Sequence, residues 1–131
     1  MKNHAPKWTL RDRLRSFTFA FSGLKILLKT QHNAWIHLVV TGVVLAVGAL
    51  LRINAIEWCL LTLAMASVWI TETLNTAIEF LTDLVSPEFH PIAGQVKDLA
   101  AAAVLISAMG AAIVGVIVFL PKIFDGFLLW L

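Results

Sequence analysis

The chain has 131 residues, of which 60% are hydrophobic and only 14% carry a formal charge. A soluble domain of this length cannot bury so much apolar surface, so this composition favours a single-domain membrane protein, for which lipid is the solvent. The formal net charge is +2, and Cys59 is the single cysteine, which excludes an intrachain disulfide.

Residues 9–29 predict an amphipathic helix that lies in the membrane interface. Two stripes share the same alternation of three- and four-residue spacings, one apolar (Leu10, Leu14, Phe17, Phe21, Leu24, Leu28) and one basic or polar (Arg11, Arg15, Thr18, Ser22, Lys25, Lys29). Most basic residues precede residue 34, and beside apolar segments they favour an anionic membrane surface over nucleic acid. The alternative is a soluble amphipathic helix packed on a core.

Three later segments predict membrane helices. Residues 34–51 carry no formal charge and approach the length of about 20 residues that a bilayer crossing needs. A second helix is expected over 55–84, after a short turn, and a third over 99–120, with Pro121 as its end. Small residues recur every four positions in the third segment, at Ala103, Ser107, Ala111 and Gly115. This spacing favours close helix packing in lipid.

The charge distribution also predicts an orientation. The basic amino-terminal segment favours a cytoplasmic amino terminus. Three crossings then place residues 82–98 in the cytoplasm and the carboxyl terminus outside.

A polar stripe interrupts the second apolar segment. Glu72, Asn75, Glu79 and Asp83 have offsets of 0, 3, 7 and 11. On a helix these positions fall within about 60° of one another. One carboxylate could hold a divalent cation and another could accept a proton, with Asn75 orienting either of them. The alternative is a solvated helix end with a structural ion pair. Lys97 would suit phosphate binding, or it could be a lysine that reaches the membrane interface.

The stretch "ETLNTAIEFLTDLVSPEFHPIAGQVKDLAAAAVL" resembles the signature of the prokaryotic diacylglycerol kinase family, and the resemblance extends over about residues 13–122. It implies an all-α integral membrane lipid kinase, one domain over residues 1–131, that assembles as a homotrimer with active sites shared between neighbours. It also implies ATP and Mg²⁺, a bacterial cell membrane, a cytoplasmic active site, and transfer of the γ-phosphate to a primary hydroxyl of a membrane lipid.

The resemblance also implies roles for individual residues. Glu72 matches the general base and Asn75 an active-site polar residue, whereas Glu79 matches a metal ligand beside the ATP phosphates. The nucleotide contacts that it implies are Glu79, Glu88, Phe89, His90, Lys97 and Asp98.

Two positions depart from the family pattern. Gln31 stands where well-known members have a glutamate metal ligand, and a neutral amide binds a hard cation more weakly. Asp12 stands where diacylglycerol kinases have a substrate-site arginine. This second departure and the motifs "HP" and "FLPK" favour undecaprenol as the substrate. Diacylglycerol is the alternative substrate, and a non-enzymatic membrane helix bundle is the alternative class of protein.

Overall fold

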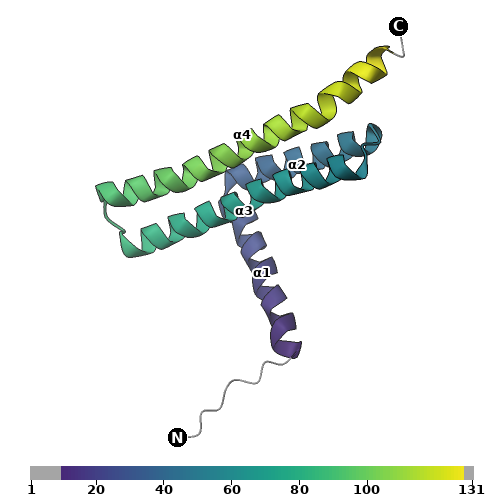
Figure 1. Ribbon diagram of the computed structural model, residues 1–131. Helices are drawn as coiled ribbons and strands as arrows, with labels where there is room; N and C mark the ends of the chain where they lie inside the picture. The colour runs from purple at the N-terminus through teal and green to yellow at the C-terminus, as the bar shows by residue number, and fades with distance from the viewer. Residues whose placement is uncertain (1–9, 129–131) are drawn as a thin grey trace, which may run out of the picture.

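A computed structural model describes the backbone of residues 10–128 and the side chains of residues 13–124. This part of the chain is helical and contains no strand. The helices are α1 (Leu10–Thr30), α2 (His32–Leu50), α3 (Ala55–Val85) and α4 (Pro91–Leu128). Figure 1 shows α2, α3 and α4 side by side as a bundle, from which α1 projects steeply near the start of α2. The chain is therefore all-α over the described residues.

Three of the described helices are long and apolar enough to cross a membrane, as the sequence predicts: α2, α3 and α4 as far as Phe124. Their large apolar side chains are mostly exposed in the single chain, including Val39, Ile106 and Ile113. Lipid tolerates such a surface, whereas water does not. The chain is therefore a membrane protein.

Local sequence explains where the first three helices begin and end. Gln31 has an extended backbone and separates α1 from α2. Between α2 and α3, Arg52 adopts a left-handed conformation with φ of 50°. Asn54 then caps α3: its side chain accepts from the N–H of Glu57 at 3.0 Å, and the Glu57 carboxylate accepts from the N–H of Asn54 at 2.7 Å. This reciprocal pair is a capping box, which satisfies donors at the start of the helix.

The helix α4 is longer than the expected 99–120. It begins at Pro91, where a proline costs little because the first helical N–H has no partner within the helix. The next N–H, that of Ile92, donates to Nδ1 of His90 at 3.2 Å. The expected end at Pro121 is wrong, because the helix continues through this residue to Leu128. A proline here removes one backbone hydrogen bond, and the turns on both sides remain helical.

The packing is strongest between α3 and α4. The hydroxyls of Ser67 and Ser107 lie 2.9 Å apart across these helices, so one of the small residues predicted to favour close packing does lie at a helix contact. Near the turn between α2 and α3, Ile53, Leu61 and Val118 form a small buried apolar cluster.

A close approach joins the last turns of α2 to the start of α3. A Cβ atom on Gly48 would lie 2.8 Å from the Trp58 ring, so only glycine fits there without a shift of the ring. This contact fixes the hairpin of α2 and α3, and with it the placement of the polar residues further along both helices.

Candidate active site

Three residues of the polar stripe of α3, Glu72, Asn75 and Glu79, face a cavity of about 310 Å³ between α2, α3 and α4. Side chains from all three helices line it: Asn33, Ile36 and His37 from α2; Glu72, Asn75 and Glu79 from α3; and Ala101, Val104, Leu105 and Ala108 from α4. The polar side chains come from α2 and α3, whereas α4 contributes an apolar wall. The cavity therefore combines a few convergent polar groups with apolar surroundings, as ligand sites commonly do.

Glu72 is the most deeply buried charged residue of this cavity, with only 1% of its surface exposed. Its Oε2 atom has no hydrogen-bond partner among the described residues, and the same is true of Oδ1 of Asn75, which is 8% exposed. Buried polar atoms usually have partners, because leaving them unpaired costs about 1–3 kcal/mol each. Both atoms are acceptors, so the cavity is suited to a ligand that brings a hydroxyl donor or a cation.

Glu79 is held by two amides. Asn75, one turn earlier on α3, donates from Nδ2 to Oε1 at 3.0 Å. Gln31, at the junction of α1 and α2, donates from Nε2 to Oε2 at 3.0 Å. Because both oxygens accept a hydrogen bond, the orientation of the carboxylate is fixed before any ligand binds.

The carboxylates of this cavity fit a metal ion only in a limited way. Within the described residues, no group of three or more histidine, cysteine, aspartate or glutamate side chains could hold a metal. Mg²⁺, however, is commonly bound by one or two carboxylates together with substrate phosphates. Glu79 fits that role for a cation that arrives with a nucleotide. Gln31 donates a hydrogen bond to Glu79, so what the structure shows for this residue is that it orients the Glu79 carboxylate.

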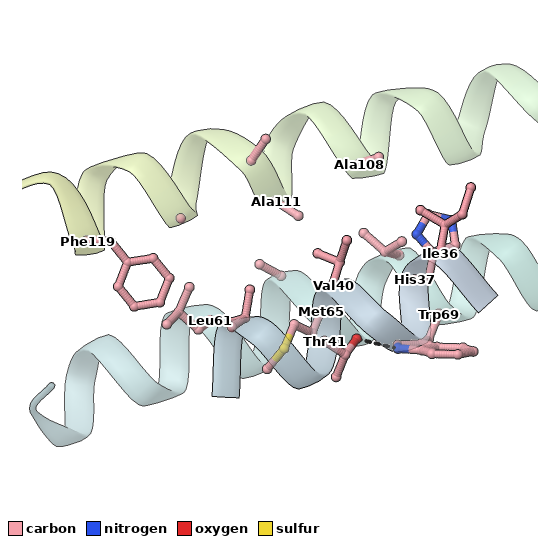
Figure 2. Close-up of a pocket in the computed structure, with 15 residues that line it drawn as sticks. Ile36, His37, Val40, Thr41, Leu61, Met65, Trp69, Ala108, Ala111 and Phe119 are labelled. Atoms are coloured by element: carbon pink, nitrogen blue, oxygen red, sulfur yellow. Dashed lines mark hydrogen bonds between the residues drawn. The ribbon is translucent and has the colours of Figure 1, made fainter. Parts of the chain in front are cut away.

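His37 lies against Glu72 and was not among the residues predicted for the site. Its Nε2 atom is 3.8 Å from Oε2 of Glu72. Its ring meets the Trp69 ring edge-to-face at a centroid distance of 6.4 Å, and Nε1 of Trp69 donates to Oγ1 of Thr41 at 3.1 Å (Figure 2). One signal in the sequence could have revealed it: Asn33, His37 and Thr41 recur every four residues along the otherwise apolar α2.

The predicted nucleotide residues beyond Glu79 form a separate group further along the bundle. Lys97 of α4 pairs with Asp83, one turn after Glu79 on α3. The other members lie on the surface: Glu88, Phe89, His90 and Asp98 are exposed, with Phe89 at 93%. These residues do not line the cavity. The structure thus brings together Gln31, Glu72, Asn75 and Glu79, and it places the other candidates near the turn between α3 and α4.

An apolar groove of about 360 Å³ continues from the cavity along the bundle. The two spaces share Ile36, His37 and Ala108. In Figure 2 the groove extends from His37 and Trp69 past Ala111 to Phe119, with α4 on one side and α2 and α3 on the other. The small residues of α4 keep this space open, and its walls are almost entirely hydrocarbon.

Comparison with known proteins gives the family of the chain. The sequence profile described as "Prokaryotic diacylglycerol kinase" matches residues 18–119. The chain is 37% identical over 109 residues to the undecaprenol kinase of Bacillus subtilis (strain 168), an alignment that covers 83% of this chain and 89% of that protein. It is 40% identical over 111 residues to a diacylglycerol kinase of Synechocystis sp., covering 84% of this chain and 63% of the relative. With the diacylglycerol kinase of Escherichia coli (strain K12) it shares 41% identity over 63 residues, or 48% and 52% of the two chains. The chain therefore belongs to the prokaryotic diacylglycerol kinase family.

Proposed function

We propose that this lipid kinase transfers the γ-phosphate of ATP to the primary hydroxyl of a membrane lipid, and that undecaprenol is favoured over diacylglycerol. The observation that carries the proposal is the buried Glu72 carboxylate, whose Oε2 has no hydrogen-bond partner among the described residues and faces a cavity between membrane helices. An unpaired acceptor in such a place is suited to a hydroxyl donor that arrives from the lipid.

The chemistry assigned to Glu72 is general-base catalysis. The lipid hydroxyl donates to Oε2 of Glu72 and loses its proton to this carboxylate as its oxygen attacks the γ-phosphorus. The new O–P bond forms as the bond to the bridging oxygen of ADP breaks. Such transfers depend mainly on positioning and electrostatic stabilisation. The hydrogen bonds that hold Glu79 provide positioning of this kind.

The nucleotide is assigned to the adjacent residues. Glu79 would hold Mg²⁺ together with phosphate oxygens, and the cation would neutralise phosphate charge. Asn75 orients Glu79 and offers its free Oδ1 to a ligand in the same cavity. Glu88, Phe89, His90, Lys97 and Asp98 are proposed to contact the rest of ATP. Lys97 would then exchange its partner Asp83 for a phosphate group.

The position of the cavity agrees with a lipid acceptor. It lies near the start of α2, where α1 leaves the bundle (Figure 1). We propose that α1 lies in the membrane interface, with apolar side chains such as Phe17 and Phe21 toward the acyl chains. The hydroxyl of a membrane lipid also lies at this depth. In the proposed orientation, the amino terminus and the nucleotide group face the cytoplasm.

The preference for undecaprenol rests on Asp12 and on the "HP" and "FLPK" motifs, and two further features agree with it. The undecaprenol kinase relative aligns over 89% of its own length. The groove beside the cavity is almost wholly apolar, which suits a prenyl chain that has no ester oxygens.

Neighbouring copies are proposed to cover the exposed apolar faces in a homotrimer and to complete each other's sites.

The test is a comparison of lipids with the purified protein. Undecaprenol and diacylglycerol are presented in matched micelles with ATP and Mg²⁺, and kcat/KM is measured for each. A higher kcat/KM for undecaprenol is expected. A preference for diacylglycerol would overturn the substrate assignment, and a lack of phosphorylation of either lipid would favour the non-enzymatic helix bundle.

A further inference from the structure

The proposed chemistry leaves a proton on Glu72, which is almost completely buried. With 1% of its surface exposed, the carboxyl group has almost no direct contact with solvent. A carboxylate that takes a proton from the lipid must release it before the next turnover. A neighbouring group that can accept this proton is therefore needed between Glu72 and water.

His37 is the neighbour with the required chemistry. Among the residues whose side chains are described, His37 and Glu79 are the ionisable groups near the Glu72 carboxylate. Both oxygens of Glu79 already accept hydrogen bonds. His37 places Nε2 3.8 Å from Oε2 of Glu72, and its side chain is 18% exposed against 1% for Glu72, so the imidazole is the more accessible of the two groups. Proton transfers need contact distances of about 2.6–3.2 Å or one intervening water, and such contacts are often longer before substrate binds.

The surroundings of His37 hold its ring in this place. The Trp69 ring packs edge-to-face against it, and the indole N–H is anchored on Thr41. Trp69 lies three residues before Glu72 on α3, and Thr41 lies four residues after His37 on α2. The imidazole and the carboxylate are therefore positioned by the same pair of helices, and the Trp69–Thr41 hydrogen bond fixes the spacing between them.

We propose that His37 is a positioning residue for Glu72 and the group through which this buried carboxyl group returns its proton after each phosphoryl transfer. The O–H bond of the Glu72 carboxylic acid breaks, and its proton binds the lone pair of Nε2, which gives a carboxylate and an imidazolium. The imidazolium then releases the proton from Nδ1 to water. Exchange through water returns the remaining ring proton from Nε2 to Nδ1, so that the Nε2 lone pair is free again for the next cycle. This inference rests on the proposed lipid kinase function.

The decisive experiment compares His37→Ala and His37→Gln with the parent protein in the lipid phosphorylation assay. For both variants, kcat is expected to fall at least about 10²-fold, the low side of what a positioned proton-transfer group contributes, with little change in KM for ATP. Added imidazole is expected to raise kcat of His37→Ala in proportion to its concentration, because it enters the space left by the side chain. A purely structural role would not produce this response.

The control is His32→Ala, which removes an exposed histidine at the first residue of α2. It is expected to keep the parental kcat and to show no response to imidazole. Parental turnover in His37→Ala, or a loss that imidazole does not restore, would overturn the role of His37. If the parent protein itself phosphorylates no lipid, the proposed function fails instead, so the two failures are distinguishable.

Discussion

Gln31 and Glu79 are joined by a hydrogen bond of 3.0 Å from Nε2 to Oε2, although 48 positions separate them in the sequence. The bond ties the junction of α1 and α2 to the candidate metal ligand on α3. The Gln31 amide donates a hydrogen bond to the Glu79 carboxylate and so orients it. A glutamate at position 31 would instead repel Glu79.

Gln31→Glu should therefore change both the stability of the protein and its metal dependence. Without a cation, two carboxylates would face each other in a half-buried place, so the thermal unfolding temperature in chelator should fall. With Mg²⁺ and ATP the same pair should bind the cation more tightly, and half-maximal activity should need less Mg²⁺. The control is Gln31→Ala, which removes the hydrogen bond without adding charge. An unchanged Mg²⁺ requirement in Gln31→Glu would show that this position does not face the cation.

The ion pair between Lys97 and Asp83 should contribute more to nucleotide binding than to stability. Both side chains are substantially exposed, at 38% and 63%, and exposed ion pairs typically contribute about 0–1 kcal/mol. Lys97→Met should raise KM for ATP by about tenfold or more, since a charge-assisted contact to phosphate contributes about 1.5–3 kcal/mol. Asp83→Asn frees Lys97 and should leave KM for ATP unchanged or lower it. An equal rise of KM in both variants would contradict the proposed exchange of partners.

The close contact at Gly48 gives a prediction about the fold alone. Gly48→Ala places a methyl group 2.8 Å from the Trp58 ring and should destabilise the protein by about 1–3 kcal/mol, as over-packing usually does. Gly42→Ala, on the same helix, meets no atom within 4 Å and serves as the matched control. Thermal unfolding in one detergent measures both variants. Equal unfolding temperatures of the Gly48→Ala and Gly42→Ala variants would show that the Trp58 ring can move away from a methyl group at position 48 at little cost.

Patterns within one helix predicted a large part of this structure. The three apolar segments and the stripe of Glu72, Asn75 and Glu79 could be found from hydropathy and helical spacing, because both depend only on residues close in sequence. Asp83 belongs to the same stripe by spacing, but the structure pairs it with Lys97 outside the cavity.

Features that depend on contacts between helices could not be predicted in the same way. The role of Gln31 as a donor to Glu79 and the contact of His37 with Glu72 both arise only when α2 packs beside α3. The prediction that the last helix ends at Pro121 is wrong for another reason. A proline removes one backbone hydrogen bond, and the adjacent turns of α4 keep the helix intact.

The most direct test of the proposed role of Glu72 is the substitution Glu72→Gln in the purified protein. Glutamine keeps the size of the side chain but cannot accept the hydroxyl proton as a carboxylate does. Lipid phosphorylation with ATP and Mg²⁺ should fall by about 10²–10⁴-fold, the range expected for loss of a general base. Binding of the ATP–Mg²⁺ complex, measured by calorimetry, should stay near the parental affinity because Glu79 and Lys97 are unchanged. Parental turnover by Glu72→Gln would contradict the assignment of this residue as the general base.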